Sequence, residues 1–107
     1  MHPHLISDDA GVWRLTADGR RFGIAWPEIY RVIGYALDGI TELHVVAELE
    51  SDAGLVLELH ADWSGFQSVV ASLSDHLPGL RPQWFATVEA LVSTDAPIVL
   101  WHRGASQ

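Results

Sequence analysis

The 107-residue chain contains no cysteine, no lysine and no asparagine. Without cysteine it cannot form disulfides, thiolate zinc sites or iron–sulfur clusters, and catalysis by a thiol is excluded. All six of its basic residues are arginines, against 14 acidic residues, so the formal net charge is −8. Proteins that bind nucleic acids or anionic membranes take their affinity from basic side chains, and we expect neither partner here. The charge favours a basic protein partner.

Long apolar runs are missing as well. No stretch approaches the roughly 20 apolar residues that a membrane-spanning helix needs. The first residues lack the basic and apolar segments of a signal peptide, so we expect a cytoplasmic protein. Hydrophobic residues make up 49 % of the chain and charged residues 19 %, enough to build one core. We therefore expect a single domain over residues 1–107, with residues 1–10 partly flexible.

The first half of the chain has the two-residue alternation of β-strands. Asp18-Gly19 lies between two strand-like runs and is typical of a type I′ turn. A two-residue turn there would pair Leu15 with Phe22 and Trp13 with Ile24, which predicts one buried apolar patch with Arg14 and Thr16 on the opposite face. Further strands are predicted over 29–36, 40–50 and 55–61.

The period changes to that of a helix at residue 64. Phe66, Val69, Val70, Leu73 and Leu77 follow helical spacing, and Ser64 with Gln67 has the pattern of a capping box. Pro78-Gly79 ends this helix. Pro82 suits the start of a second short helix reaching residue 92, and 98–101 is a final strand. The prediction is an α+β fold: an antiparallel meander of about five strands, two short helices and a C-terminal strand.

A meander followed by a capped helix resembles the pleckstrin-homology-like small barrels, although those folds usually end in one long helix. The segments Leu77-Pro78-Gly79 and Leu100-Trp101-His102-Arg103, together with Trp84, are similar to a loose set of short bacterial proteins. The first resemblance implies a small barrel. The second implies a bacterial origin and no particular activity.

One cluster of chemically useful side chains lies on the predicted hairpin of 40–62. If Leu49 pairs with Leu55, His44 lies opposite His60 and Glu42 opposite Asp62. Glu48 and Glu58 lie on the same polar face. Two imidazoles with carboxylates can hold a divalent metal or supply general acid–base groups. The simpler interpretation, which we favour, is that these are ordinary polar residues on the wet side of a sheet.

Five tryptophans are many for a chain of this length. Trp13 and Trp84 follow the predicted core pattern, whereas Trp26, Trp63 and Trp101 are less constrained. Aromatic side chains often anchor protein interfaces, and carboxylates beside them suit a basic partner. The candidate interface therefore comprises Trp26, Trp63, Trp101, Glu48 and Glu58.

Two functions remain open from the residues alone. No nucleophile elbow or glycine-rich phosphate loop is present, so we expect no cofactor and favour a non-catalytic role. The first hypothesis is an acidic interaction module (an adaptor, a regulatory subunit or an immunity-type protein) that binds a basic protein. Its last strand could also pair edge to edge in a homodimer. The alternative is a small metal-dependent or acid–base enzyme that uses the face carrying His44 and His60.

Overall fold

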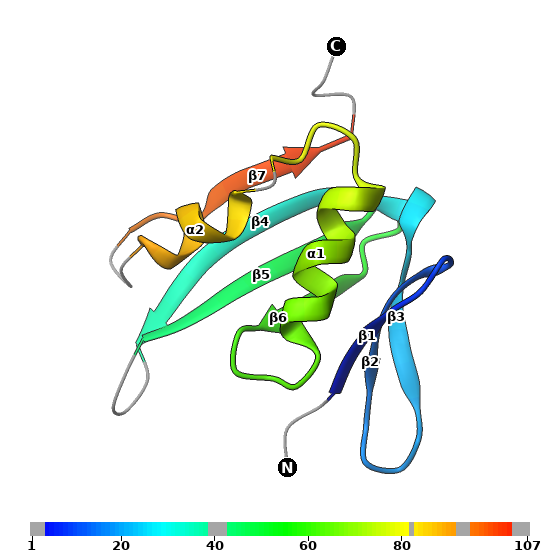
Figure 1. The fold of residues 1–107 in the computed structure, drawn as a ribbon. Helices are drawn as coiled ribbons and strands as arrows, with labels where there is room; N and C mark the ends of the chain where they lie inside the picture. Colours follow the sequence, from blue (N-terminus) through cyan, green and yellow to red (C-terminus); the bar gives the residue numbers. More distant parts are fainter. Residues whose placement is uncertain (1–3, 39–42, 82, 92–94, 104–107) are drawn as a thin grey trace.

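A computed structural model describes residues 4–38, 43–81, 83–91 and 95–103 (Figure 1). Within these residues the chain forms seven strands, one short 3-10 turn and two α-helices. In order they are β1 (His4–Ser7), β2 (Gly11–Leu15), β3 (Arg21–Ala25), the 3-10 turn Trp26–Glu28, β4 (Ile29–Asp38), β5 (Leu43–Ser51), β6 (Val56–His60), α1 (Phe66–His76), α2 (Trp84–Glu89) and β7 (Ile98–His102).

The strands form two antiparallel sheets, one with the order β1-β2-β3 and one with the order β6-β5-β4-β7. This confirms the predicted α+β class, the meander, the two short helices and the last strand. The described strands do not close into a barrel, because no ladder joins the two sheets. Strand β1 was not predicted from the sequence, and it adds an edge to β2.

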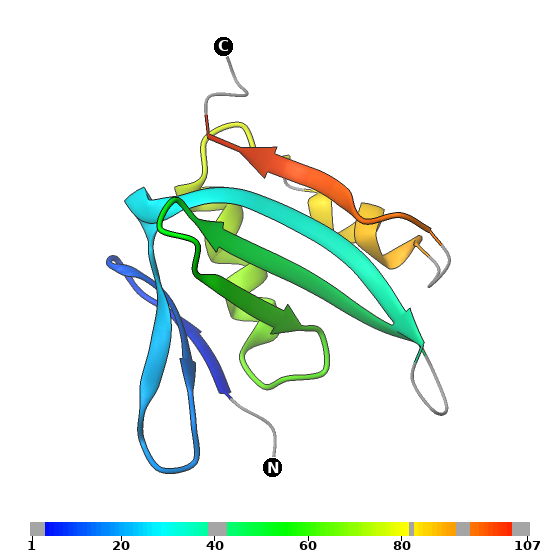
Figure 2. The same cartoon turned by 180° about the vertical axis from the view of Figure 1, so that it is seen from behind.

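Both helices lie on the same face of the four-stranded sheet, and α1 also contacts β1 of the smaller sheet (Figure 1). The helical stripe predicted for α1 is confirmed, since Phe66, Val69 and Leu73 are fully buried. They meet Leu57 and Leu59 of β6 in one core. Seen from behind, the other face of the four-stranded sheet has no described helix over it (Figure 2). We call this the solvent face.

The register of the first hairpin differs from the prediction by one residue. Trp13 lies opposite Gly23, and Val12 lies opposite Ile24. The loop has three residues rather than two, because Thr16 N–H donates to Arg20 O and Gly19 adopts a left-handed φ of 85°. The expected patch is therefore divided: of its members only Ile24 belongs to the buried core, together with Val12 opposite it, whereas Phe22 is 36 % exposed and lies opposite Arg14.

The second hairpin has the same kind of loop. Ser51 N–H donates to Leu55 O, and Gly54 has a φ of 89°. The Ser51 hydroxyl accepts from the N–H groups of Ala53 and Leu55. This loop pairs Leu49 with Leu57 and not with Leu55, a shift of two residues from the prediction. A shift of two keeps every side chain on its predicted face but changes its cross-strand neighbour.

Helix α1 begins without the predicted capping box. Its N-cap is Gly65, with a left-handed φ of 84° and no side-chain cap. The Ser64 hydroxyl instead bonds to His4 Nδ1 at 2.6 Å, and Ser64 O accepts from Leu5 N–H at 2.8 Å. The residue before the helix is thus used to hold β1. The proposed start of α2 at Pro82 lies outside the described residues, and α2 ends at Glu89, before the predicted boundary.

In the described part of the chain, neither helix has the length and apolar character needed to cross a membrane.

Candidate functional site

The solvent face is organised in rows that run across the sheet, because directly paired residues on neighbouring strands share a face. Three rows follow from the pairings: His102, Arg31, Glu50 and Val56; Val99, Ile33, Glu48 and Glu58; and Tyr35, Val46 and His60. The middle row crosses all four strands and changes from apolar at β7 to acidic at β6. This row therefore has an apolar end at β7 and an acidic end at β6, and the acidic end of the solvent face means Glu48 and Glu58.

Two carboxylates lie directly opposite each other in the middle row. Glu48 on β5 pairs with Glu58 on β6, an arrangement that is destabilising for like charges. Each has a local hydrogen-bond partner: Tyr35 Oη lies 2.6 Å from Glu48 Oε2, and His60 Nε2 lies 2.9 Å from Glu58 Oε1. Burial raises the pKa of Tyr35 above its ordinary value, and the hydrogen bond to Glu48 raises this pKa further. Tyr35 therefore remains a neutral donor and leaves the negative charge of Glu48 in place.

The neighbouring carboxylate differs, because an arginine already neutralises it. Arg31 donates to Glu50 Oε1 from Nε at 2.8 Å and approaches the same oxygen with Nη2 at 2.7 Å. The side chain of Glu50 is 19 % exposed, against 49 % for Glu58. The negative charge that remains accessible on this face is thus concentrated at Glu48 and Glu58.

Exposed apolar side chains occur on the same face as this carboxylate pair. Val99 of β7 is 54 % exposed and Val56 of β6 is 46 % exposed. Leu37, farther along β4, is 44 % exposed. Val56 and Val99 lie on the two edge strands of this sheet, so the uncovered face offers apolar contacts at separate positions on either side of the carboxylates and not one continuous apolar patch.

The predicted arrangement of His44, His60, Glu42 and Asp62 is wrong in its pairing. The shifted register places Val46, and not His44, opposite His60. Glu42 and the side chain of His44 lie outside the described residues. Among the residues that are described, no three histidine or acidic side chains come together as metal ligands. His60 instead bonds to Glu58 and stacks on Trp63, with ring centroids 4.3 Å apart.

The candidate interface tryptophans fall into two places. Trp63 contacts His60 and so borders the acidic end of the solvent face. Trp26 and Trp101 instead line one cleft of about 370 Å³ away from that face, together with His76, Pro78 and others. Trp26 is 9 % exposed, stacks on His76 with centroids 4.1 Å apart, and donates its indole N–H to Asp8 O at 2.7 Å.

Trp101 is fixed in a similar way, since its indole N–H donates to Pro78 O at 2.7 Å. Both tryptophans of the cleft therefore use their polar atoms inside the protein and offer ring surface only. Arg103, on the rim, donates to Pro27 O at 2.8 Å and to Asp52 Oδ2 at 3.0 Å. The cleft is thus largely apolar, and its two indole N–H groups and the Arg103 guanidinium already have partners.

No family model, curated protein or solved structure matches this chain.

Sequence reasoning identified Glu48, Glu58 and Trp63 but missed Tyr35, Ile33 and Val99. The alternation along β4 was visible in the sequence, because Arg31, Ile33, Tyr35 and Leu37 are spaced by two. The alternation does not show which strands pair with β4. Only the pairing of β4 with both β5 and β7 places Val99 and Ile33 in the same row as the two carboxylates.

Proposed function

We propose that the protein is a non-catalytic interaction module that binds a basic, partly apolar segment of another protein on its solvent face. A lysine or arginine of the partner lies between Glu48 and Glu58, and apolar partner side chains cover Val99 and Val56. The observation that supports this most is the directly opposed pair of carboxylates on an uncovered sheet face. A bound cation relieves their mutual repulsion, so the pair favours an occupied state.

The net charge supports the same choice of partner. With a net charge of −8, the chain attracts a basic protein at long range and repels acidic ones. A second copy of this chain is a poor occupant, because it would bring a second Glu48–Glu58 pair against the first. Edge pairing through β7 is a separate possibility that leaves this face uncovered.

Selection from a random peptide library displayed on phage tests the proposal. We expect peptides enriched on the wild-type protein at low salt to carry arginine or lysine beside apolar residues. Synthetic copies of these peptides are then titrated against variants by fluorescence anisotropy. The double variant Glu48→Gln/Glu58→Gln should weaken binding about tenfold, and added salt should weaken binding to the wild type.

The control is Asp75→Asn/Glu89→Gln, which removes the same charge from exposed positions on α1 and α2. We expect it to change affinity less than twofold, since exposed charges at a distance are screened by salt. Equal weakening by both double variants would mean that net charge alone attracts the peptides, and the proposed surface would be wrong. Enrichment of acidic or uncharged peptides would overturn the choice of partner.

A further inference from the structure

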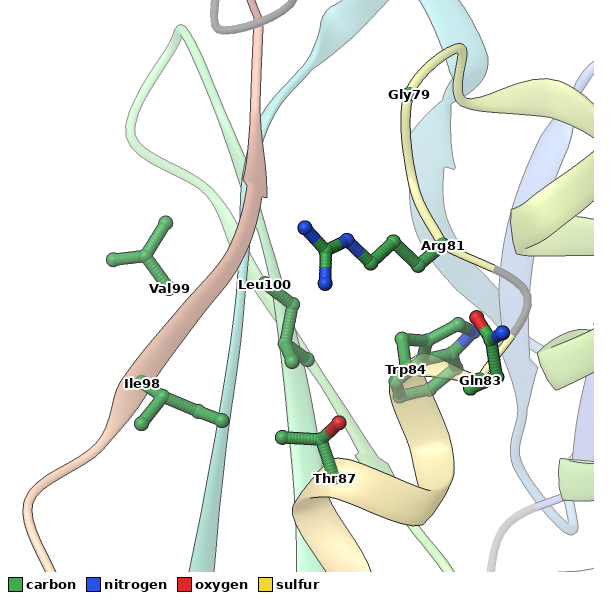
Figure 3. Close-up of a pocket in the computed structure, with 8 residues that line it drawn as sticks. All are labelled: Gly79, Arg81, Gln83, Trp84, Thr87, Ile98, Val99 and Leu100. Carbon is green, nitrogen blue, oxygen red and sulfur yellow. The ribbon is translucent and has the colours of Figure 1, made fainter.

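A second cavity lies on the other side of the sheet, between α2 and β7 (Figure 3). Its volume is about 730 Å³, within the range of roughly 300–1,000 Å³ that is usual for small-molecule sites. Apolar walls come from Trp84, Ile98 and Leu100. Polar groups come from Arg81, Gln83 and Thr87. Figure 3 shows the Arg81 side chain reaching across the cavity toward β7, with Thr87 below it on α2.

Arg81 differs from the other arginines of this chain. Four of them form ion pairs: Arg20 with Asp18, Arg21 with Asp8, Arg31 with Glu50 and Arg103 with Asp52. Arg14 lies over the ring of Phe22. Arg81 alone has neither an ion pair nor an aromatic partner within the described ranges. In a chain with 14 acidic residues, a cation that faces a cavity without a carboxylate partner is unexpected.

A bulge in β7 shapes the apolar wall. Trp101 pairs with Val32 and Val99 pairs with Ile33, so Leu100 is the extra residue between two paired positions. Bulges redirect side chains and are frequent beside binding sites. Here the bulge places Leu100 in the cavity with Arg81, while its neighbour Trp101 enters the cleft with Trp26.

The inner end of the cavity is closed by close packing of α2 on β4. A Cβ added at Gly34 would lie 2.6 Å from Val88 Cγ2 and 3.1 Å from Leu100 Cδ1. Val88 is fully buried and Trp84 is 2 % exposed. The floor is therefore fixed and apolar, and the charged group of Arg81 lies on the side that faces solvent.

We propose that this cavity binds a small apolar carboxylate, such as a fatty acid of medium length. The carboxylate pairs with the Arg81 guanidinium, and the Thr87 hydroxyl, on the same side of the cavity in Figure 3, is the nearest further donor drawn there, whereas the Gln83 amide lies beside Trp84. The hydrocarbon body lies against Trp84, Ile98 and Leu100. A guanidinium matches the planar carboxylate with two parallel N–H groups, and this geometry gives specificity as well as affinity.

A single negative charge fits the site better than a phosphate. The single positive charge of Arg81 balances one negative charge. A phosphate dianion would also meet the repulsion of a chain whose net charge is −8. The apolar part of the lining, from Ile98 and Leu100, favours a ligand that carries a hydrocarbon or aromatic group beside its carboxylate.

Calorimetric titration with decanoate, below its micelle concentration, tests the proposal. We expect saturable binding of decanoate at one site and about tenfold weaker binding of the uncharged analogue decanol. Decylamine, which carries a positive charge, should bind no more strongly than decanol. Arg81→Met keeps a long side chain but removes the charge, and it should weaken decanoate about tenfold while leaving decanol unchanged. The control Arg20→Met removes the same charge from an exposed ion pair in the β2–β3 loop and should leave decanoate binding unchanged.

The position of the ligand is checked by NMR. Trp84 lines the cavity, so the signal of its indole N–H, which is buried and has no acceptor among the described residues, reports on ligand binding there. Decanoate should shift this signal, identified with Trp84→Phe, more than the indole signals of Trp26 and Trp101. Equal affinity of Arg81→Met and wild type for decanoate would overturn the proposal. So would an absence of binding, or shifts confined to Trp26 and Trp101. None of these results bears on peptide binding at the solvent face.

Discussion

Gly65→Ala is expected to destabilise the fold far more than Gly54→Ala, although the two glycines have nearly the same φ, 84° and 89°. For each, an alanine in this left-handed conformation costs about 1–2 kcal/mol. Part of this loss is offset by the reduced freedom of the unfolded chain. No atom lies within 4 Å of a Cβ added at Gly54, so the expected loss there is about 1 kcal/mol.

At Gly65 the surroundings add to this cost. A Cβ there would overlap the carbonyl oxygen of Leu5 and lie 2.9 Å from its carbonyl carbon, and backbone atoms cannot rotate away. Strand β1 must move, which weakens the hydrogen bond from Leu5 N–H to Ser64 O, worth about 0.5–1.5 kcal/mol. Leu5 is 1 % exposed, and burying such a side chain fully is worth about 1.5–3 kcal/mol. Adding part of the hydrogen-bond and burial losses to the conformational cost, we expect a total loss of about 3 kcal/mol.

Urea unfolding followed by tryptophan fluorescence measures both variants, with the m-value as a check that the unfolded states are comparable. The expected difference between them is about 2 kcal/mol, with Gly65→Ala the less stable. Losses that agree within about 0.5 kcal/mol would refute the reasoning, because they would show that only φ matters at Gly65. The β1 contact before α1 would then contribute nothing measurable to folding.

Two further predictions concern titration. The indole N–H of Trp13, with the N–H groups of Ala10 and Gly11, lowers the pKa of Asp8 from 3.8 to about 2. Its contribution to stability is therefore present above pH 3.8 and is lost as the pH falls toward about 2. Asp8→Asn should make the melting temperature less sensitive to pH in that window, and a carboxyl pKa near 3.8 by NMR would contradict this. Because the pKa of Tyr35 is raised in the folded state, its contribution to the free energy of unfolding is fully present below the ordinary pKa of 10.0. This contribution is lost as the pH rises above 10.0. Ultraviolet titration should show one tyrosine that ionises well above pH 10.0, and this late phase should disappear in Tyr35→Phe.

The two hairpins show where sequence reasoning succeeded and where it failed. Strand positions in this hairpin were predicted correctly for the described residues 43–60, as were the polar faces from residue 45 on, because alternation depends only on neighbours along the chain; the predicted start at residue 40 lies outside the described residues. Registers were not. Both loops share a serine or threonine, two intervening residues and a glycine, as in Thr16-Ala17-Asp18-Gly19 and Ser51-Asp52-Ala53-Gly54. In each, the glycine ends a three-residue loop.

This loop pattern was visible in the sequence, but Asp-Gly is also typical of a two-residue turn. The choice was made by packing: Val12 and Ile24 fit against the core, while Trp13 lies outside under Arg21, 4.5 Å from the guanidinium carbon to the ring centroid. The same limit applies to the candidate metal site. A shift of two residues kept the polar face but separated the histidine positions that the hypothesis needed.

The sequence by itself determined the class of fold, the strand and helix periods and the acidic character, since these depend on composition and on residues close in the chain. Tertiary structure decided which residues meet. Pairing of β5 with β6 placed Glu48 opposite Glu58, and the bulge of β7 against β4 placed Leu100 beside Arg81. The β4–β7 contact joins strands far apart in the chain, and the β5–β6 contact depends on the register of a hairpin. In both cases the geometry is set by packing on the shared core and not by alternation along the chain. In this chain of net charge −8, the tertiary structure therefore produces two specific charged features. One is the opposed carboxylate pair on one face of the sheet, and the other is an arginine on the opposite side that has no carboxylate partner among the described residues.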